Sequence, residues 1–395
     1  YLIQKCDFIQ KKNGVFKLIE KERKNILNSN KMMTMNSLRT MAFAYKEINS
    51  SAKSQLEEGL IFTGIVGMED PPREEVKEAI SICQKAGITV KMITGDNKET
   101  ARAIALEIGL YGKLMSGDEL DNITDRQLAK VINSISIFAR VKPEHKLRIV
   151  RALKSNGEIV TVTGDGVNDA PALKEAQIGV AMGKNGTDLS RSVADLTLKD
   201  DNFFTIVLAI KEGRIIFKNI QKFVTYQLSC NFAELSILLI GVLLAPFLGW
   251  PIPLLLALQI LFVNLVTDNI PAITLSLNPS SKDTMSDQPR KKAEIITKNV
   301  IVLLVFTGSL LMFLVLSSYY FTFNILGESL EYSRTVALFS LICLAIVSAF
   351  NFRSFRKGVL NRSLFTNPHL VYASTISLIA TFVIIYSPLN RVFET

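Results

Sequence analysis

The chain has 395 residues, 48% of them hydrophobic, and a formal net charge of +9. This length accommodates two or three domains. The basic residues are dispersed and no recognition motif accompanies them, so we predict no nucleic-acid partner. Four widely spaced cysteines form no CxxC pair, which predicts neither a cysteine metal site nor a disulfide framework and favours a cytosolic soluble part: Cys6, Cys83, Cys230 and Cys343.

Charged side chains are distributed unevenly along the chain. They are dense and mixed up to about residue 221, whereas residues 223–281 contain only two, Glu234 and Asp268. We therefore expect a soluble part followed by a membrane part.

The first 58 residues are polar and indicate little structure. Residues 17–27 fit a helix with weak apolar spacing, and residues 40–45 are apolar enough for a strand, with a helix nearly as plausible. Residues 60–67 then form an apolar run that predicts a buried strand.

From residue 60 onward, short apolar runs alternate with amphipathic segments. The runs predict strands at 60–67, 88–94, 135–139, 158–163 and 178–182. The segments between them predict helices at 73–86, 98–108, 143–154 and 170–176. Such alternation is typical of a parallel, doubly wound sheet, in which ligands bind at the carboxyl ends of the strands.

Acidic loops follow three of these predicted strands, at Asp70, at Gly95-Asp96-Asn97 and at Gly164-Asp165. Asp165 and Asp169 lie close enough in the sequence to repel each other, and a bound Mg²⁺ would offset their charge. An ordinary turn rich in Asp and Asn is the alternative for any one loop. Three such loops at strand ends favour a functional site.

The polar residues of these loops fit phosphoryl transfer. The chain has no GxxxxGK[ST] motif and neither histidine lies in a nucleophile context, so a Walker loop and a Ser-His-Asp triad are excluded. Thr94 and Gly95 could donate hydrogen bonds to phosphate, and Lys146 could neutralise it, although alone this lysine would be interpreted as solvated. The remaining candidates beside them are Asp96, Asp165, Asn168 and Asp169.

Five apolar segments after residue 222 approach or exceed the length that spans a bilayer: 223–247, 253–276, 299–323, 335–352 and 370–387. The loop at 278–298 and the loop after the fourth segment are rich in Lys and Arg, whereas the other two loops are not. The positive loops predict that the soluble part lies in the cytosol and that the chain is a multi-pass membrane protein.

Glu234 and Asp268 are carboxylates in the middle of predicted membrane spans, where burial is costly and indicates function. Asn231 shares a helix face with Glu234, and Asn264 and Thr267 share one with Asp268. Pro271 is expected to break or unwind the second helix and free its carbonyls. We predict an oxygen cage for a hard cation; polar side chains that join two helices are the alternative.

Four segments carry motifs in a fixed order: Met68-Glu69-Asp70-Pro71-Pro72-Arg73, Met92-Ile93-Thr94-Gly95-Asp96-Asn97, Thr163-Gly164-Asp165-Gly166-Val167-Asn168-Asp169-Ala170-Pro171 and Asn264-Leu265-Val266-Thr267-Asp268. Together they resemble the P-type ATPases, in particular the calcium-pump branch, over nearly the whole chain. The resemblance implies the end of a nucleotide-binding domain at 1–58, an α/β haloacid-dehalogenase-like phosphorylation domain with a Rossmann-like parallel sheet at 59–221, and a transmembrane domain of about five helices at 222–395.

The resemblance also implies roles for single residues. Asp165 would coordinate Mg²⁺ with support from Asp169 and Asn168, Thr94 and Gly95 of the Thr94-Gly95-Asp96 motif would contact phosphate, and Lys146 would hold the aspartyl phosphate. Residues near ATP would be Arg39, Asp70, Arg73 and Arg140. The likeness turns residues 40–45 towards the strand interpretation. The transported cation would be held by Asn231, Glu234, Asn264, Thr267 and Asp268.

Two departures from the family pattern limit these expectations. The phosphorylated aspartate of Asp-Lys-Thr-Gly and the Thr-Gly-Glu motif occur nowhere in the sequence. We expect them in a part that precedes residue 1, so the chain would be a C-terminal fragment that does not turn over ATP by itself. Ala345 stands where some calcium pumps place an acidic ligand, which favours one calcium ion per cycle.

The sequence thus favours an ATP-driven cation pump that removes Ca²⁺ from the cytosol through an aspartyl phosphate. A pump for Na⁺, K⁺ or H⁺ is the alternative, because the same two carboxylates could serve those ions. A phosphatase held by an inert membrane anchor is a further hypothesis, but an anchor requires no carboxylate at mid-span.

Overall fold

The computed structural model describes residues 2–35, 38–47, 57–68, 71–279, 284–290, 294–355 and 363–395. Two compact units divide the chain. The first consists of Tyr1–Leu208 with Met285–Lys291, and the second of Ala209–Thr284 with Lys292–Thr395.

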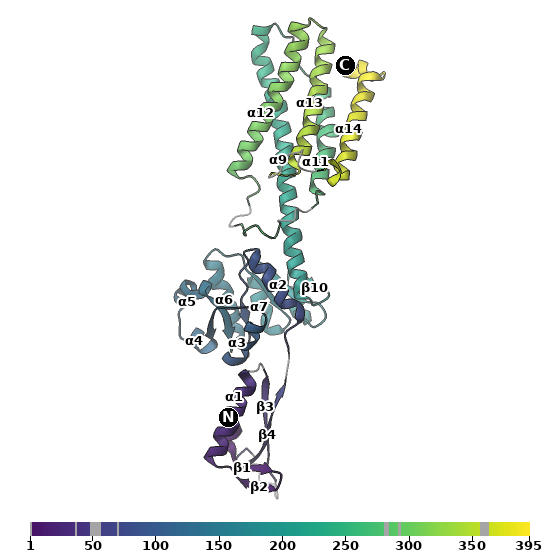
Figure 1. The fold of residues 1–395 in the computed structure, drawn as a ribbon. Coiled ribbons are helices and arrows are strands. Elements are labelled where there is room, and N and C mark those ends of the chain that lie inside the picture. The colour runs from purple at the N-terminus through teal and green to yellow at the C-terminus, as the bar shows by residue number, and fades with distance from the viewer. Residues whose placement is uncertain are drawn as a thin grey trace. The chain divides into compact units, whose positions relative to one another are not determined.

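A four-stranded sheet in the order β2-β1-β4-β3 begins the first unit (Figure 1). Its strands are β1 (Cys6–Lys11), β2 (Gly14–Lys17), β3 (Arg39–Tyr45) and β4 (Leu60–Met68), with helix η1 (Leu2–Lys5) before them and α1 (Glu20–Met35) between β2 and β3. Residues 40–45 are therefore a strand, and the predicted helix at 17–27 begins later and extends further.

Strand β4 pairs with β1 in parallel and with β3 in antiparallel orientation. The sequence pattern grouped this strand with the strand–helix alternation that follows it. A periodicity argument cannot assign a strand's neighbours, because pairing depends on segments such as β1 and β2 that carry only short, weakly apolar patterns.

Two three-stranded parallel sheets follow, in the orders β5-β7-β6 and β10-β9-β8. Their strands are β5 (Met92–Ile93), β6 (Lys113–Ser116), β7 (Ile135–Ala139), β8 (Thr161–Gly164), β9 (Ile178–Met182) and β10 (Leu196–Leu198). The predicted parallel α/β architecture is confirmed. The strand predicted at 88–94 is reduced to two residues, and β6 and β10 are too short for a periodicity to be seen.

Seven helices in the described part of the first unit accompany these sheets: α2 (Glu74–Lys85), α3 (Lys98–Glu107), α4 (Gly117–Asp121), α5 (Asp125–Val131), α6 (Pro143–Ser155), α7 (Ala170–Glu175) and α8 (Asp188–Val193). Both sheets contribute to one hydrophobic core, which contains Phe138 of β7, Ile149 of α6 and Ala172 of α7, with Val162 of β8 packed against it. This shared core fixes the loops at the carboxyl ends of β5, β7 and β8.

The described residues include five helices long and apolar enough to cross a membrane, as predicted. They are α9 (Phe203–Leu248), the composite helix of α10 (Ala257–Phe262), η5 (Val263–Asp268) and α11 (Asn269–Ser276), α12 (Lys298–Tyr320) with η6 (Phe321–Ile325), α13 (Leu330–Phe352) and α14 (Pro368–Tyr386), and the short α15 (Asn390–Phe393) follows. Within the second unit α12 packs on α13 and α11 on α14, and these helices lie side by side (Figure 1).

The sequence predicted that the composite helix would break or unwind at Pro271, but the helix does not unwind there. It stays continuous and widens into the π-helical segment η5, which contains Asn264, Thr267 and Asp268. Pro271 has no N–H to donate to the carbonyl of Thr267, so ordinary α-helical bonding is interrupted at this point. π-helical turns of this kind are frequently found at functional sites.

Candidate active site and cation site

The loop after β5 is a closed turn. The Thr94 hydroxyl donates a hydrogen bond to Oδ2 of Asp96 (2.7 Å), and the Asp96 N–H donates to the Thr94 hydroxyl (3.1 Å). Asn97 then caps α3 by accepting the N–H of Thr100 (2.9 Å). Local polar side chains therefore hold the Thr94-Gly95-Asp96 motif in place, as is usual for Thr, Asp and Asn at turns and helix starts.

Backbone hydrogen bonds join this loop to the segment that follows β7. The Thr94 N–H donates to the carbonyl of Phe138 (2.9 Å), the Arg140 N–H to that of Asp96 (2.7 Å), and the Val141 N–H to that of Thr94 (3.1 Å). Arg140 itself has a left-handed backbone with φ of 53°. The Thr94-Gly95-Asp96 motif and the segment around Arg140 thus form one structural element at neighbouring strand ends.

Lys146 lies on the first turns of α6 and pairs with the first residue before α7. Its ammonium donates to Oδ1 of Asp169 at 2.5 Å, and the other carboxylate oxygen accepts the Gly166 N–H at 3.3 Å. Asp169 is only 8% exposed. The structure therefore brings together two of the predicted site residues as a nearly buried ion pair, in which the cation offsets the cost of burying the carboxylate.

Asp165 and Asn168 are exposed beside this pair. Among the described residues no hydrogen bond or ion pair engages the Asp165 carboxylate, whereas its backbone carbonyl accepts the Thr187 N–H (2.8 Å) and the Ser190 hydroxyl (3.1 Å). A carboxylate that is fixed by its backbone but open at its oxygens suits Mg²⁺, which binds few protein ligands and keeps waters and phosphate oxygens. The residues present therefore fit this ion.

Gly164 is required where β8 ends. A Cβ at this position would lie 2.5 Å from the Cβ of Asp169. Only glycine allows the chain to turn this closely over Asp169, so the small residue of the Gly164-Asp165 motif has a steric role.

The four residues expected near ATP have different outcomes. Asp70 lies outside the described residues. Arg39 begins β3, and its side chain is not described. Arg73 is exposed and its guanidinium donates to the backbone carbonyl of Asp201, while Arg140 is exposed after β7. Their roles stay predictions.

Asp201 was missed by the sequence argument. Its buried carboxylate accepts the N–H groups of Gly183 (2.6 Å), Lys184 (3.0 Å) and Asn185 (2.8 Å), and these bonds, led by that of Lys184, hold its pKa below the usual range. The loop it holds leads to Thr187, which contacts Asp165. Only the run Asp200-Asp201-Asn202 before α9 could have pointed to it.

In the second unit α9 and η5 meet through Glu234 and Asn264. The Asn264 side-chain amide donates to Oε2 of Glu234 at 2.6 Å and also to the carbonyl of Ile260 at 3.1 Å. Glu234 is 6% exposed and Asp268 is 1% exposed. Two carboxylates from different membrane helices are thus buried in one region of the bundle.

Several oxygens of this region have no partner among the described residues: Oδ1 of Asn231, Oε1 of Glu234, and both Oδ1 and Oδ2 of Asp268. The Thr267 hydroxyl donates to the carbonyl of Val263 (2.9 Å), which leaves its oxygen able to accept or coordinate. Buried oxygens without a donor are costly. A cation that binds there removes this cost, because every one of these atoms is a ligand that hard cations accept.

No group of three His, Cys, Asp or Glu side chains in the described ranges lies close enough to hold a metal ion. A cation at either site would therefore draw on amide, hydroxyl or carbonyl oxygens, phosphate or water besides the carboxylates. This mixed oxygen set is what Mg²⁺ and Ca²⁺ commonly use.

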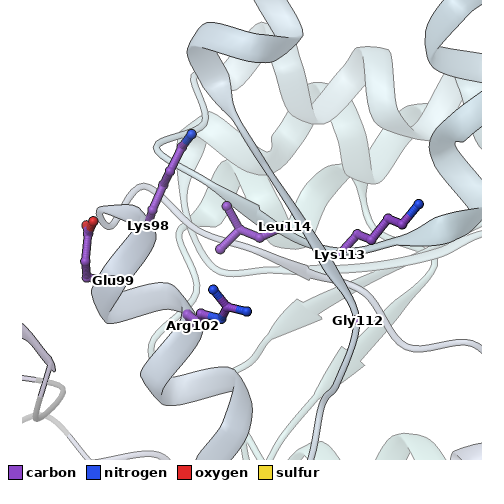
Figure 2. Close-up of a pocket in the computed structure, with 6 residues that line it drawn as sticks. All are labelled: Lys98, Glu99, Arg102, Gly112, Lys113 and Leu114. Carbon is purple, nitrogen blue, oxygen red and sulfur yellow. The ribbon is translucent and has the colours of Figure 1, made fainter.

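A pocket of about 580 Å³ lies between α3 and the start of β6 (Figure 2). It is lined by Lys98, Glu99, Arg102, Gly112, Lys113 and Leu114, none of which was predicted to belong to the site. Figure 2 shows the Lys113 side chain pointing away from that of Arg102, so the basic groups do not converge on one position.

Two family models match the chain: a haloacid dehalogenase-like hydrolase over residues 20–177 and a cation transporting ATPase C-terminus over residues 252–395. A calcium-transporting ATPase of Bacillus cereus is 42% identical over 99% of this chain and 46% of its own length. Calcium-transporting ATPase type 2C member 1 of Homo sapiens is 37% identical over 100% of this chain and 42% of its own length. The chain spans somewhat less than half the length of these curated relatives.

Proposed function

Since the chain belongs to the cation-transporting P-type ATPases, we propose that it forms part of a pump that couples ATP hydrolysis, through an aspartyl phosphate, to Ca²⁺ transport out of the cytosol. The observation that carries this proposal is Asp268, a carboxylate only 1% exposed on a membrane helix, with two oxygens that have no partner among the described residues. The relatives from Bacillus cereus and Homo sapiens are calcium-transporting ATPases, which supports Ca²⁺ as the cargo.

The soluble site supplies the phosphoryl-transfer part of this function. Lys146 neutralises charge on the transferring phosphoryl oxygens, and the Gly95 N–H donates a hydrogen bond to them. The Thr94 hydroxyl, which donates to Asp96 in this structure, would join it by turning from Asp96 to the phosphate. Mg²⁺, when bound at Asp165 with Asp169 and Asn168 nearby, neutralises further charge on the phosphate. The contact between Lys146 and Asp169 (2.5 Å) supports this arrangement, because it holds the lysine at the place where the metal-binding carboxylates lie.

The membrane site supplies the cargo position. Glu234 and Asp268 repel each other when both are ionised, and a divalent cation balances two negative charges where Na⁺ or K⁺ balances one. Asn231, Asn264 and Thr267 would complete the oxygen ligands. A pump for Na⁺, K⁺ or H⁺ is the second candidate, since a proton on either carboxylate would also relieve the repulsion.

The positive loops support a multi-pass protein in the lipid bilayer with its soluble domains in the cytosol. We assign residues 1–58 to a nucleotide-binding part, 59–221 to the phosphorylation domain and 222–395 to the membrane domain, except that β4, which pairs with β1 and β3, goes with the nucleotide-binding part. Arg39, Asp70, Arg73 and Arg140 would lie near ATP, with Asp96 shaping the phosphate loop.

The test is Ca²⁺-stimulated ATP hydrolysis and Ca²⁺ uptake by the protein in sealed vesicles. Asp268→Asn should abolish both, whereas Glu331→Gln, an exposed carboxylate at the start of α13, should leave both unchanged. Asp165→Asn should abolish phosphoenzyme formation, with the exposed Asp118→Asn of α4 as its matched control. Stimulation by Na⁺ or K⁺ alone, or calcium uptake that survives Asp268→Asn, would overturn the calcium assignment.

A further inference from the structure

The thiol of Cys230 lies on α9 beside the proposed cation site. Cys230 directly precedes Asn231 and is one turn before Glu234, so the side chains of Cys230 and Glu234 share a helix face. Only 2% of Cys230 is exposed. Its wide spacing from the other cysteines excluded a site built on a cysteine pair, but a single thiol can still join ligands of another kind.

The neighbours of this thiol are one carboxylate, one hydroxyl and several apolar side chains. Cys230 interacts with Asp268 of η5 across the helix interface and with Tyr226 along α9. It belongs to the same hydrophobic cluster as Ala272 of α11 and Ala345 of α13. Both carboxylate oxygens of Asp268 nevertheless have no hydrogen-bond partner in the described part of the chain, so the thiol lies beside the carboxylate without satisfying it.

A buried cysteine is by itself an ordinary core residue, because free cysteines are often buried and pack as small hydrophobic side chains. Cys230 differs because it lies beside the Asp268 carboxylate, which is only 1% exposed and lacks a partner on either oxygen among the described residues. Such a carboxylate is costly to bury unless a cation or a hydrogen-bond donor joins it. The thiol and the carboxylate together therefore form a position that a cation can occupy.

Sulfur changes which cation this position prefers. Hard ions such as Ca²⁺ and Mg²⁺ bind oxygen ligands, whereas Zn²⁺ and the chemically similar Cd²⁺ bind cysteine sulfur. When such an ion binds Cys230, a bond from Sγ to the metal replaces the S–H bond and the proton leaves to water. The negative charges of this thiolate and of the Asp268 carboxylate then balance one divalent cation, as those of Glu234 and Asp268 would.

The remaining ligands of such an ion must be neutral oxygens. Since no three His, Cys, Asp or Glu side chains in the described ranges lie close enough to hold one metal ion, Glu234 does not join Cys230 and Asp268 at its present position. The side-chain oxygen of Asn231 has no hydrogen-bond partner within those ranges either. This oxygen and water are therefore the ligands available to complete the shell around the ion.

We propose that Cys230 makes the membrane site a binding position for thiophilic divalent cations, which are held by Sγ of Cys230 together with the carboxylate of Asp268. A soft ion at this position occupies Asp268 and thereby excludes Ca²⁺, so Cys230 determines how the site discriminates between soft and hard cations. The competition with Ca²⁺ rests on the function proposed above, whereas the binding of the soft ion does not.

The first test is a titration of the full chain in detergent with Cd²⁺, followed by the ultraviolet absorption of the cadmium–thiolate bond. In a variant that retains Cys230 as its single cysteine, this absorption should rise and saturate. Asp268→Asn in the same background should weaken Cd²⁺ binding at least about tenfold, since even outer-shell groups typically contribute that much to metal affinity. Glu331→Gln, which removes an exposed carboxylate at the start of α13, is the matched control and should leave Cd²⁺ binding unchanged.

The second test keeps the other cysteines in place. In sealed vesicles, the Cd²⁺ concentration that halves Ca²⁺ uptake should be at least about tenfold higher for Cys230→Ser than for the wild type. Serine replaces the sulfur with an oxygen, so Sr²⁺, a hard ion, should inhibit both proteins equally. Cys343→Ser, the same substitution at a half-buried position of α13, should not change the inhibition by Cd²⁺.

The two tests separate this proposal from the proposed function. Cd²⁺ binding that Asp268→Asn leaves unchanged would mean that Cys230 is a lone thiol, and inhibition that Cys230→Ser leaves unchanged would mean that Cd²⁺ acts elsewhere. Either result would overturn the proposal. Cd²⁺ binding that requires both Cys230 and Asp268, in a protein without Ca²⁺ uptake, would support the soft-ion site and count against the proposed function alone.

Discussion

The soluble site and the membrane site both bury a carboxylate, but they compensate its charge differently. Asp169 is paired with Lys146 at 2.5 Å and also accepts a backbone N–H. Asp268 has no hydrogen-bond partner on either oxygen among the described residues, and the nearby Glu234 has one, from Asn264. The soluble carboxylate is therefore stabilised by the protein itself, whereas Asp268 would gain such compensation only from the proposed cation.

This difference determines how the stability of each site depends on a ligand. The ion pair of Lys146 with Asp169 holds the lysine in position without a ligand. An uncompensated pair of carboxylates stores unfavourable free energy that binding releases, and this couples occupancy to the stability of the helix bundle. Substitutions that neutralise each carboxylate should consequently have opposite effects on stability.

The largest expected effect is that of Asp268→Asn. The asparagine carries no charge to bury, so in the absence of Ca²⁺ the apparent melting temperature in detergent should rise, corresponding to about 1–4 kcal/mol of stabilisation. The same variant should lose the further rise that saturating Ca²⁺ gives the wild type, about 2.7 kcal/mol at a hundredfold excess over Kd. A lower melting temperature without Ca²⁺ would mean that Asp268 joins helices rather than binding cargo.

A second test removes the steric basis of the soluble site. Gly164→Ala places a Cβ 2.5 Å from that of Asp169, so we expect a loss of about 1–3 kcal/mol in stability and displacement of Asp169 from Lys146. The control is Gly64→Ala in β4, where an added Cβ meets no atom within 4 Å. Chemical denaturation followed by the fluorescence of a probe on the first unit measures both. Equal stability of the two variants would show that the close turn is not needed.

Asp169→Asn should act in the direction opposite to Asp268→Asn. It leaves the Lys146 ammonium without its counter-charge. Because the Lys146 side chain is 25% exposed to solvent, the free energy of unfolding should fall by only about 1 kcal/mol. Thermal unfolding of the two variants side by side is the measurement. If both move the melting temperature in the same direction, the two sites do not differ in charge compensation.

Much of this organisation could be predicted from the sequence, because it depends on local patterns. The strands at 135–139 and 178–182 have the observed bounds, and the helix starts at Lys98 and Pro143 follow from a capping Asn and a proline in the first turn. The five membrane helices follow from apolar length. At these positions the residue types themselves, a capping Asn, a first-turn proline or a long apolar run, determine the local structure.

What could not be predicted depends on partners far apart in the chain. The pairing of β4 with β1 is set by strands whose own pattern is weak. The widening of the composite helix before Pro271 is a choice between unwinding and π-helical bonding that packing decides. His145 has no nucleophile context in the sequence, and only the fold shows that it contacts Asp121, which lies 24 residues earlier.

The smallest effect concerns Asp201 and distinguishes the soluble unit by its response to acid. The N–H groups of Lys184, Asn185 and Gly183 hold the pKa of this carboxyl below its usual range, so its unfolded value is the higher of the two. Stability from Asp201 is therefore present above the unfolded pKa, about 3.9, and is lost as the pH falls through the folded one. Asp201→Asn should lower stability slightly at neutral pH, since a neutral acceptor replaces a charged one, and should flatten the acid limb of the stability profile. Denaturation of wild type and variant between about pH 7 and pH 3 measures this, with Asp118→Asn as the control because that carboxylate is exposed on α4. An acid limb that is identical in wild type and Asp201→Asn would assign the pH dependence to other carboxylates and leave the loop before Thr187 to be held by its backbone alone.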